Sequence, residues 1–241
     1  ITTRYYSRDK QGNSTHTNAE LTAEAIRALC TNGFKLDDIE LLTSGTTSPD
    51  QILPAHGVMV HGLLKSKPIE TITFSGSCCS GMNALKYAYM SVLTGNSNNA
   101  VTTGSEKLST WMSAQTFEEE AAKLNELEEN PMLAFEKDFL RWMLSDGAAA
   151  TLISNKPNTD GISLKIEWIE ICSFANEAEA CMYVGSDKDA EGNLHGWSEY
   201  KPKEWLEKSI FAMKQDTRLL DQYIAQLGTK RYVEMFQKHN V

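Results

Sequence analysis

A β-rich run that ends in a turn of small residues and opens into a helical pattern constrains the fold more than any other feature. Residues 71–74 favour a strand, and the turn at 75–81 consists of three serines, two glycines and two cysteines. Apolar residues then recur at helical spacing until Gly95. A strand that leads through a short turn into a helix begins a crossover connection, so this pattern predicts an α/β architecture.

The neighbouring segments continue the alternation of strand and helix. Thr17 and Glu20 form a capping-box pattern at the start of a helix that ends at Gly33. Further elements are predicted as strands at 39–43, 100–103 and 148–153, and as a helix at 54–64 with Pro54 in its first turn. The order predicts a mixed or parallel sheet with crossover helices.

The remaining segments have weaker patterns. Ile162, Leu164, Ile166 and Trp168 alternate with polar residues, which predicts a half-buried strand. The tail from Lys203 onward is predicted to be helical. The stretch 116–130 contains six glutamates and is interpreted as a solvated surface helix or insertion.

Composition limits the classes of partner. The net charge of −9 disfavours nucleic acid and anionic membranes. No apolar run approaches the roughly 18 residues of a membrane span, and the polar, charged N-terminal residues do not form a signal peptide. Five irregularly spaced cysteines indicate reduced thiols and a cytoplasmic location.

Cys79 is the candidate nucleophile. It lies where the predicted strand gives way to the helix, and the positive end of a helix stabilises a thiolate. The small residues around it would let a substrate carbonyl reach the sulfur and find backbone N–H groups nearby. The pattern alone leaves open that Cys78 and Cys79 are two buried structural cysteines.

Four segments resemble β-ketoacyl-acyl-carrier-protein synthase III, a family of thiolase-fold condensing enzymes. Residues 74–82 resemble its nucleophile segment, and the match aligns Cys79 rather than Cys78 with the nucleophile. The others follow in the family's order: a threonine-rich loop, a glycine-serine-acid segment and an aspartate-glycine-alanine motif (45–54, 104–109 and 144–150). A further segment, 134–143, resembles ketosynthases that form resorcinol- or cyclohexanedione-type products.

The resemblance implies a thiolase-like fold of layered α-β-α-β-α architecture, of which this chain covers mainly the first half. It places a first half with the nucleophile at 1–155, and a connecting segment with the start of the second half at 156–241. The chain begins without Met and stops after a helical pattern, so we expect a fragment of a longer protein. The family's catalytic histidine and asparagine are then expected beyond Val241.

The histidines of this chain offer no matching substitute. His56 and His61 lie five residues apart on a predicted helix and are interpreted as surface or core-edge residues. His195 lies in a polar loop where solvent exposure is expected. His239 follows a helical pattern without the family's sequence context and receives no role.

Four further residues are predicted to bind substrate because of the resemblance. Leu53 matches a position that reaches across a dimer into the partner's acyl pocket, although an ordinary apolar residue at a helix start fits as well. Gly81 would let the helix pack tightly at the active turn. Glu106 follows the strand beside the nucleophile, and Gly147 would shape a turn against the cysteine segment.

The activity implied is that of a ketosynthase-type acyltransferase in fatty-acid or polyketide-like synthesis. Cys79 would accept an acyl group from acyl-CoA or acyl carrier protein, and a malonyl- or ketoacyl-thioester would then condense with it. A homodimer without metal or resident cofactor is expected. Two alternatives stay open: a catalytically silent partner subunit, and an acyltransferase to oxygen or nitrogen.

Overall fold

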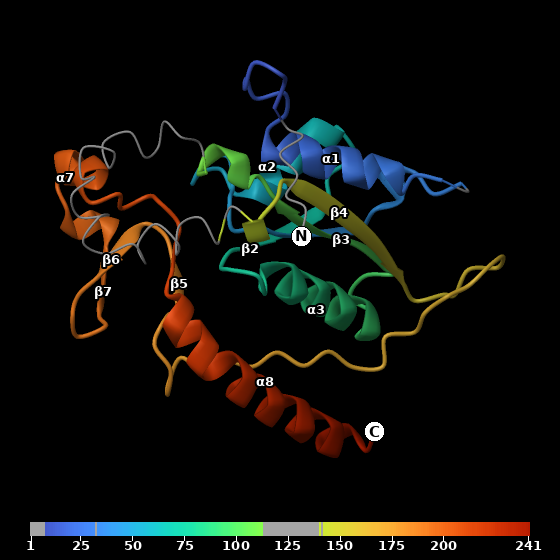
Figure 1. Ribbon diagram of the computed structural model, residues 1–241. Coiled ribbons are helices and arrows are strands. Elements are labelled where there is room, and N and C mark those ends of the chain that lie inside the picture. Colours follow the sequence, from blue (N-terminus) through green and yellow to red (C-terminus); the bar gives the residue numbers. More distant parts are fainter. Residues whose placement is uncertain (1–7, 32, 113–139, 141) are drawn as a thin grey trace. The chain divides into compact units, whose positions relative to one another are not determined.

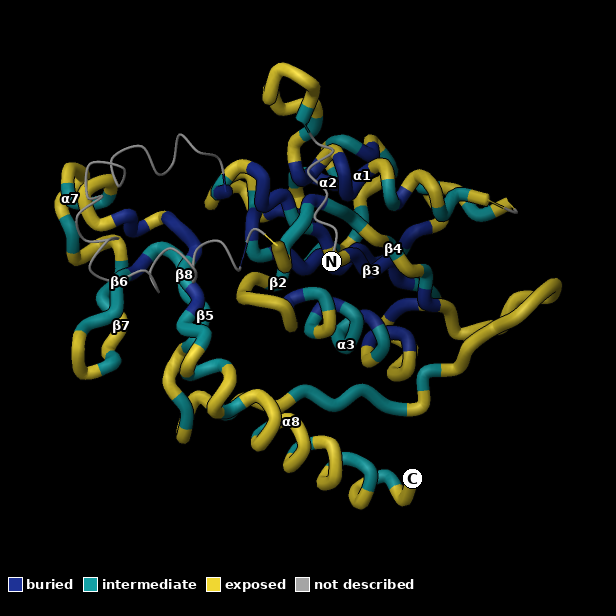
Figure 2. Tube along the Cα trace, viewed as in Figure 1, coloured by how far each residue is buried: buried dark blue, intermediate teal, exposed yellow. Residues whose placement is uncertain are grey.

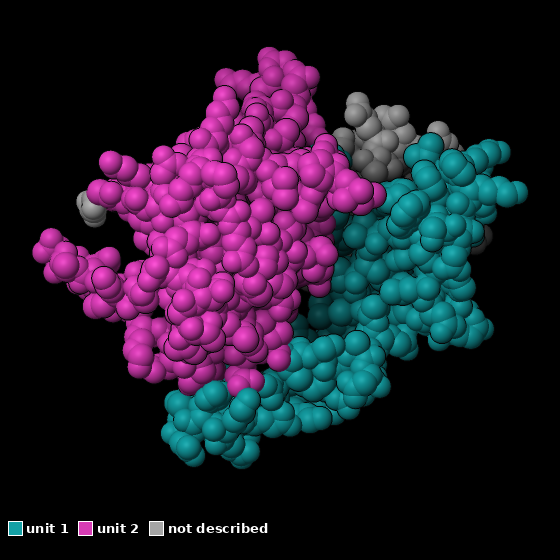
Figure 3. Space-filling model, turned by 180° about the vertical axis from the view of Figure 1, so that it is seen from behind, with its two compact units in different colours: residues 1–4, 109–144, 172–241 teal, residues 5–108, 145–171 magenta. Residues whose placement is uncertain are grey.

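The computed structural model describes residues 8–31, 33–112, 140 and 142–241. The chain divides into two compact units (Figure 3). The sheet unit, magenta in Figure 3, comprises Tyr5–Leu108 and Ser145–Ile171. The other unit, teal in Figure 3 and called the second unit below, comprises Ile1–Arg4, Ser109–Leu144 and Cys172–Val241. The predicted acidic stretch at 116–130 lies outside the described residues. The predicted division at residue 155 remains a prediction.

A four-stranded mixed sheet forms the centre of the sheet unit. Its strands lie in the order β2-β1-β3-β4. Strand β1 is parallel to both β2 and β3, whereas β4 is antiparallel to β3. The mixed sheet predicted from the alternating pattern is therefore confirmed, with strands at Leu41–Gly45 (β1), Glu70–Phe74 (β2), Asn99–Glu106 (β3) and Gly147–Ser154 (β4).

Helices cover both faces of this sheet (Figure 1). Helices α1 (Asn18–Ala28) and α2 (His56–Leu64) pack on one face, and α3 (Ser80–Leu93) packs on the other. Successive strand residues point to opposite faces, so Leu42 packs beneath α1 and α2 while Leu41 packs beneath α3. Every residue of β1 is buried, and none of the four strands carries a charged residue at its centre, because a charge is costly to bury between two layers of helices.

The predicted capping box of α1 is present. Glu20 N–H donates to Thr17 Oγ1 at 3.1 Å, and Thr17 N–H donates to Glu20 Oε2 at 2.8 Å. Two backbone donors that lack a partner inside the helix are thereby satisfied.

Some boundaries differ from the predictions. Helix α2 begins at His56, so Pro54 precedes the helix and does not lie in its first turn. The predicted strand 162–168 is wrong: this segment pairs with no described strand, and Ile162 and Leu164 are exposed. Ile166 packs instead against the core beneath α3. Alternation of apolar residues signals burial of one face, and here the first two of these residues lie outside the core.

The described part of the second unit contains short elements and one long helix. Two-stranded sheets pair β5 (Met182–Tyr183) with β8 (Lys214–Gln215), and β6 (Ser186–Lys188) with β7 (Leu194–Gly196). The predicted helical tail is interrupted, because β8 separates α7 (Pro202–Glu207) from α8 (Thr217–His239). Helix α8 has no buried residue (Figure 2). Short 3-10 helices lie at Leu36–Asp38, Leu108–Thr110 and Trp197–Glu199.

Among the described helices, none is both long and apolar enough to cross a membrane.

Candidate active site

Glycines bring the start of α3 into direct contact with the ends of β1 and β3. Gly45 ends β1, and a Cβ atom at this position would overlap the Ser80 backbone and lie 2.5 Å from Gly81 N. Gly81 also lies against Gly104 of β3, where a Cβ on Gly81 would meet the Gly104 Cα at 3.7 Å. Close packing was predicted for Gly81. The stricter steric requirement falls on Gly45, for which the sequence predicted no such role.

Cys79 is the N-cap residue of α3, at the strand-to-helix turn where it was predicted. Its carbonyl accepts the Asn83 N–H at 2.9 Å, and the preceding turn closes with Ser80 N–H donating to Ser77 O at 2.9 Å. Both Cys78 and Cys79 are exposed, so the alternative of two buried structural cysteines does not fit. The Cys79 side chain caps no backbone group, and the residue stands at the positive end of the helix dipole.

A second loop, 46–50, runs beside this cysteine turn (75–79). We call it the threonine loop. Thr46 N–H donates to Phe74 O at 3.1 Å and so continues the pairing of β1 with β2. The Thr47 hydroxyl reaches the cysteine turn itself, where it donates to Gly76 O at 2.6 Å.

The start of α1 holds one side of the threonine loop. The Asp50 carboxylate accepts the N–H groups of Asn18 at 2.7 Å and Ala19 at 2.9 Å. The Asn18 side-chain amide in turn donates to Thr46 Oγ1 at 2.9 Å and to Ser48 O at 2.8 Å. A carboxylate at a helix N-terminus is favoured by the helix dipole, so these contacts join the loop firmly to α1.

Glu106, at the end of β3, binds the other side of the threonine loop. One carboxylate oxygen accepts Thr47 N–H at 2.7 Å, and the other accepts Ser48 N–H at 3.0 Å and Ser48 Oγ–H at 2.5 Å. Both oxygens are therefore turned toward the loop. Gly147 pairs opposite Glu106 in the β3–β4 ladder, so it lies at the same edge of the sheet. The predicted roles of both residues in substrate binding remain predictions.

Leu53 lies beyond the threonine loop with its side chain 79% exposed, next to Ile52 at 80%. The predicted role of Leu53 in a partner's acyl pocket remains a prediction.

His56 is buried beneath these loops, so its interpretation as a surface or core-edge residue is wrong. Its Nε2 lies 3.1 Å from Thr22 Oγ1 and 3.2 Å from Ser105 Oγ. Because Thr22 Oγ1 donates to Asn18 O at 2.9 Å, its oxygen accepts the Nε2 proton. Burial lowers the pKa of His56 below its usual value, and the nearby Asp50 opposes this only in part.

His195 occupies a hairpin of the second unit. Its Nδ1 lies 3.0 Å from Glu199 Oε2 and its Nε2 lies 3.1 Å from Asp189 Oδ2. These two carboxylates raise the pKa of His195, and hydrogen bonds from Asn193 and His195 lower the pKa of Asp189 to about 2. The residue is partly exposed, as predicted, and it makes local contacts within the hairpin.

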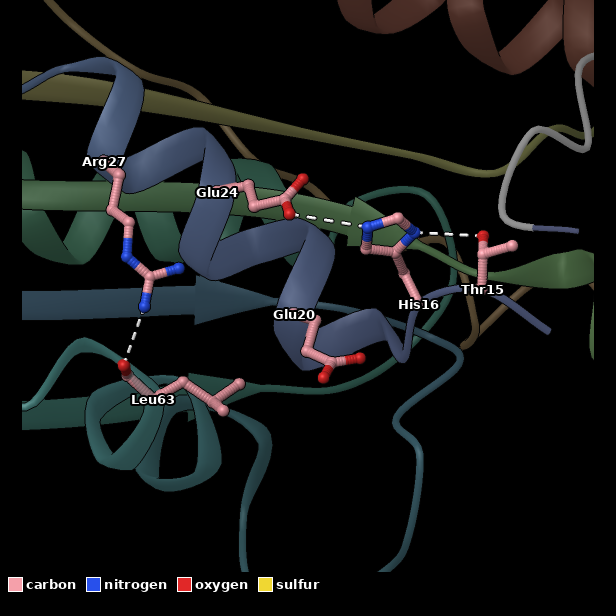
Figure 4. A pocket seen from close by; sticks show the side chains of 6 residues that line it. All are labelled: Thr15, His16, Glu20, Glu24, Arg27 and Leu63. Carbon is pink, nitrogen blue, oxygen red and sulfur yellow. Dashed lines mark hydrogen bonds and ion pairs between the residues drawn. The ribbon is translucent and has the colours of Figure 1, made fainter.

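A surface pocket of about 360 Å³ lies on the outer side of α1 (Figure 4). Its polar groups are already engaged: His16 Nε2 lies 3.4 Å from Glu24 Oε1, and Arg27 donates to Leu63 O at 2.8 Å. The pocket residues include no nucleophile, and Cys79 is not among them. Within the described part of the chain, no group of three or more His, Cys, Asp or Glu side chains could hold a metal ion.

Comparison with known proteins agrees with this geometry. No family model matches the chain. Over 110 residues it is 29% identical to β-ketoacyl-[acyl-carrier-protein] synthase III of Clostridium perfringens, a match covering 45% of the chain and 32% of that protein.

Two solved structures share the fold over most of the chain. AbyA1, a tetronic acid condensing enzyme, has a TM-score of 0.65 at 16% identity over 97% of the chain and 60% of AbyA1. A Xanthomonas campestris OleA structure with bound lauric acid and lauroyl-CoA has a TM-score of 0.60 at 17% identity, over 94% of the chain and 58% of OleA.

The chain is therefore an α/β protein with the thiolase-like fold of the condensing enzymes. The resemblance to β-ketoacyl-acyl-carrier-protein synthase III, which was predicted from four sequence motifs, is confirmed. The chain spans less than two thirds of the length of each of these relatives. The finer resemblance of 134–143 to resorcinol- or cyclohexanedione-forming enzymes falls almost wholly outside the described residues and stays a prediction.

Proposed function

We propose that this chain carries the acyl-accepting part of a ketosynthase-type condensing enzyme, with Cys79 as the nucleophile. The observation that supports this most is the position of Cys79: exposed, at the N-cap of α3, in a fold shared with condensing enzymes. A cysteine in this position combines access to substrate with a local field that favours the thiolate.

In the first step, the Cys79 thiolate attacks the carbonyl carbon of an acyl thioester. A new carbon–sulfur bond forms, the bond to the carrier sulfur breaks, and the carrier leaves as a thiolate that takes up a proton. Backbone N–H groups in the first turn of α3 have no partners inside the helix. They are suited to hold the oxyanion that develops on the acyl carbonyl.

In the second step, a malonyl- or ketoacyl-thioester supplies the carbon nucleophile. Loss of CO₂, or of a proton, leaves a carbanion that attacks the Cys79-bound acyl group, and the cysteine sulfur departs as the carbon–carbon bond forms. We propose that the histidine and asparagine that assist this step lie beyond Val241. In the sheet unit, His56 is buried and its Nε2 faces Thr22 and Ser105, so it does not fill that role.

The substrate class follows from the relatives and remains part of the proposal. A condensing enzyme that makes tetronic acid and a protein that binds lauroyl-CoA share this fold. We therefore propose acyl-CoA or acyl carrier protein as the donor, in fatty-acid or polyketide-like synthesis. The reaction needs no resident cofactor or metal, and the free state of all five cysteines supports a cytoplasmic location.

Intact-protein mass spectrometry of the full-length protein tests the first step. Incubation with acyl-CoA or acyl carrier protein should add one acyl mass to the wild type and to Cys78→Ala, and none to Cys79→Ala. Cys78→Ala is the matched control because it removes the neighbouring exposed thiol. Acylation of Cys79→Ala at the wild-type rate would show that another residue is the nucleophile.

Release of CO₂ from a malonyl thioester then separates the remaining alternatives. A condensing enzyme acylated at Cys79 either releases CO₂ from the malonyl thioester or joins its acyl group to a ketoacyl thioester without releasing CO₂. An acyltransferase to oxygen or nitrogen is acylated but gives neither CO₂ nor a carbon–carbon-bonded product, and a silent partner subunit is not acylated at all.

A further inference from the structure

The cysteine turn is tied to the threonine loop by one side chain, Thr47. Its hydroxyl donates to Gly76 O at 2.6 Å, three residues before the candidate nucleophile. Gly76 has a φ of +128°, in a region that L side chains rarely adopt. Among the described residues no atom lies within 4 Å of a Cβ placed on Gly76, so the requirement for glycine comes from the backbone angle and not from a close neighbour.

Because glycine is conformationally permissive, the peptide group between Gly76 and Ser77 needs an external contact to keep one orientation. The Thr47 hydroxyl supplies that contact at the carbonyl oxygen. The next peptide group, between Ser77 and Cys78, carries the carbonyl that accepts the N–H of Ser80, the first residue of α3. Rotation of the Gly76–Ser77 peptide changes the backbone dihedral of Ser77, and through it this neighbouring peptide, the entry into the helix and the direction of Cys79.

Thr47 can act as a fixed support only if its own loop is fixed. Glu106 accepts Thr47 N–H at 2.7 Å and binds Ser48 through its second oxygen. Lys107 N–H donates to Ser48 Oγ at 2.8 Å, which continues the chain of contacts along the end of β3. Hydrogen bonds to a carboxylate are stronger than those between neutral groups.

We propose that Glu106 and Thr47 are positioning residues for the nucleophile: Glu106 fixes the threonine loop, and the Thr47 hydroxyl holds the Gly76 carbonyl so that Cys79 faces the helix N-terminus. The proposal rests on the proposed function, since it assumes that Cys79 is the reacting group. It gives Glu106 a role other than direct contact with substrate.

The test measures the reactivity of Cys79 without any acyl substrate. In a Cys78→Ser background of the full-length protein, alkylation of Cys79 by iodoacetamide is followed by peptide mass spectrometry from pH 5 to 9. Thr47→Val removes the hydroxyl and keeps the side-chain shape, whereas Thr47→Ser keeps the hydroxyl. Thr94→Val is the matched control, because its hydroxyl donates to Met90 O at 2.9 Å at the far end of α3.

Thr47→Val should slow alkylation at neutral pH roughly tenfold, the effect of one lost hydrogen bond. Thr47→Ser should stay within about twofold of the wild type, and Thr94→Val should match it. Glu106→Gln should slow the reaction like Thr47→Val. In acylation assays the maximal rate should fall while the half-saturating substrate concentration stays nearly constant, because the substrate contacts are intact.

Two results would overturn the proposal: a wild-type rate for Thr47→Val, or equal losses in Thr47→Val and Thr47→Ser. If Glu106→Gln does not fold, the comparison of Thr47→Val with Thr47→Ser still tests the proposal. If the wild type is not acylated by any thioester yet its alkylation depends on the Thr47 hydroxyl, the proposed function fails and the positioning role stands.

Discussion

His56 illustrates at the scale of one residue how burial decides the charge state of a side chain. It lies fully inside the sheet unit, with Nε2 near two hydroxyls and Nδ1 without a hydrogen-bond partner. Water would stabilise the imidazolium, and the interior does not, so burial lowers the pKa of His56. The neutral form is therefore built into the native state.

A pH dependence of stability follows. In the unfolded chain this histidine gains a proton as the pH falls through about 6.5, whereas in the native state it resists protonation. The contribution of His56 is thus fully present above pH about 6.5 and is lost as the pH falls below it toward the lowered native pKa. His56→Gln, whose side-chain amide can also donate to Thr22, does not titrate.

Urea unfolding of wild type and His56→Gln at pH 7.5 and pH 5.0 measures the effect. The free energy of unfolding of the wild type should fall more between these pH values than that of the variant. An equal change in both proteins would contradict the assignment of a neutral, buried His56.

At the scale of elements, the contact between α3 and β1 depends on the absence of a side chain at Gly45. The helix backbone at Ser80 and Gly81 occupies the space that a Cβ would need. Since a backbone cannot turn away as a side chain can, even one methyl group would push the helix off the strand. The cysteine turn, which joins β2 to α3, would move with it.

Gly45→Ala should therefore destabilise the protein by about 2 kcal/mol or more, within the range of overpacked cores, and should slow acylation of Cys79. Gly81→Ala is the matched control: its Cβ would make an ordinary contact of 3.7 Å with Gly104, and alanine favours a helix. Thermal and urea unfolding of both variants gives the comparison. Equal stabilities of the two variants would show that the helix adjusts to the added methyl group.

At the scale of the whole molecule, the sequence resemblance leads us to expect a homodimer in which Leu53 enters the partner's acyl pocket. Among the described strands, β2 lies at an edge of the sheet, where a further strand could pair with it. Ile52 and Leu53 expose most of their aliphatic surface. Both features are compatible with that expectation, which remains a prediction.

Leu53→Asp in the full-length protein should weaken that association, because a carboxylate is costly to bury in an apolar interface. Light scattering coupled to size-exclusion chromatography should show a mass near two chains for the wild type and a lower mass for the variant. Ile162→Asp is the control, since Ile162 is 88% exposed in a segment far along the chain. If Leu53→Asp keeps the wild-type mass and the same preference for acyl-chain length, Leu53 lies outside both interface and pocket.

Local patterns determined much of this protein. The capping box at Thr17 and Glu20, the strand-to-helix turn at Cys79 and the alternation of strands and helices all follow from patterns of residues close in sequence. The same reasoning failed at 162–168, because alternating residues form a strand only when another strand is present to pair with them.

The tertiary structure alone decided which distant residues meet. His56 became buried because α1 and the end of β3 close over it, and Gly45 became indispensable because α3 starts on top of it. Two hydrogen bonds join residues that are distant in sequence: Thr47 and Gly76 are 29 residues apart, and Glu106 and Ser48 are 58 residues apart. No pattern in the sequence predicts either contact. Such contacts depend on the register of parallel strands, which brings the carboxyl ends of β1, β2 and β3 to one edge of the sheet.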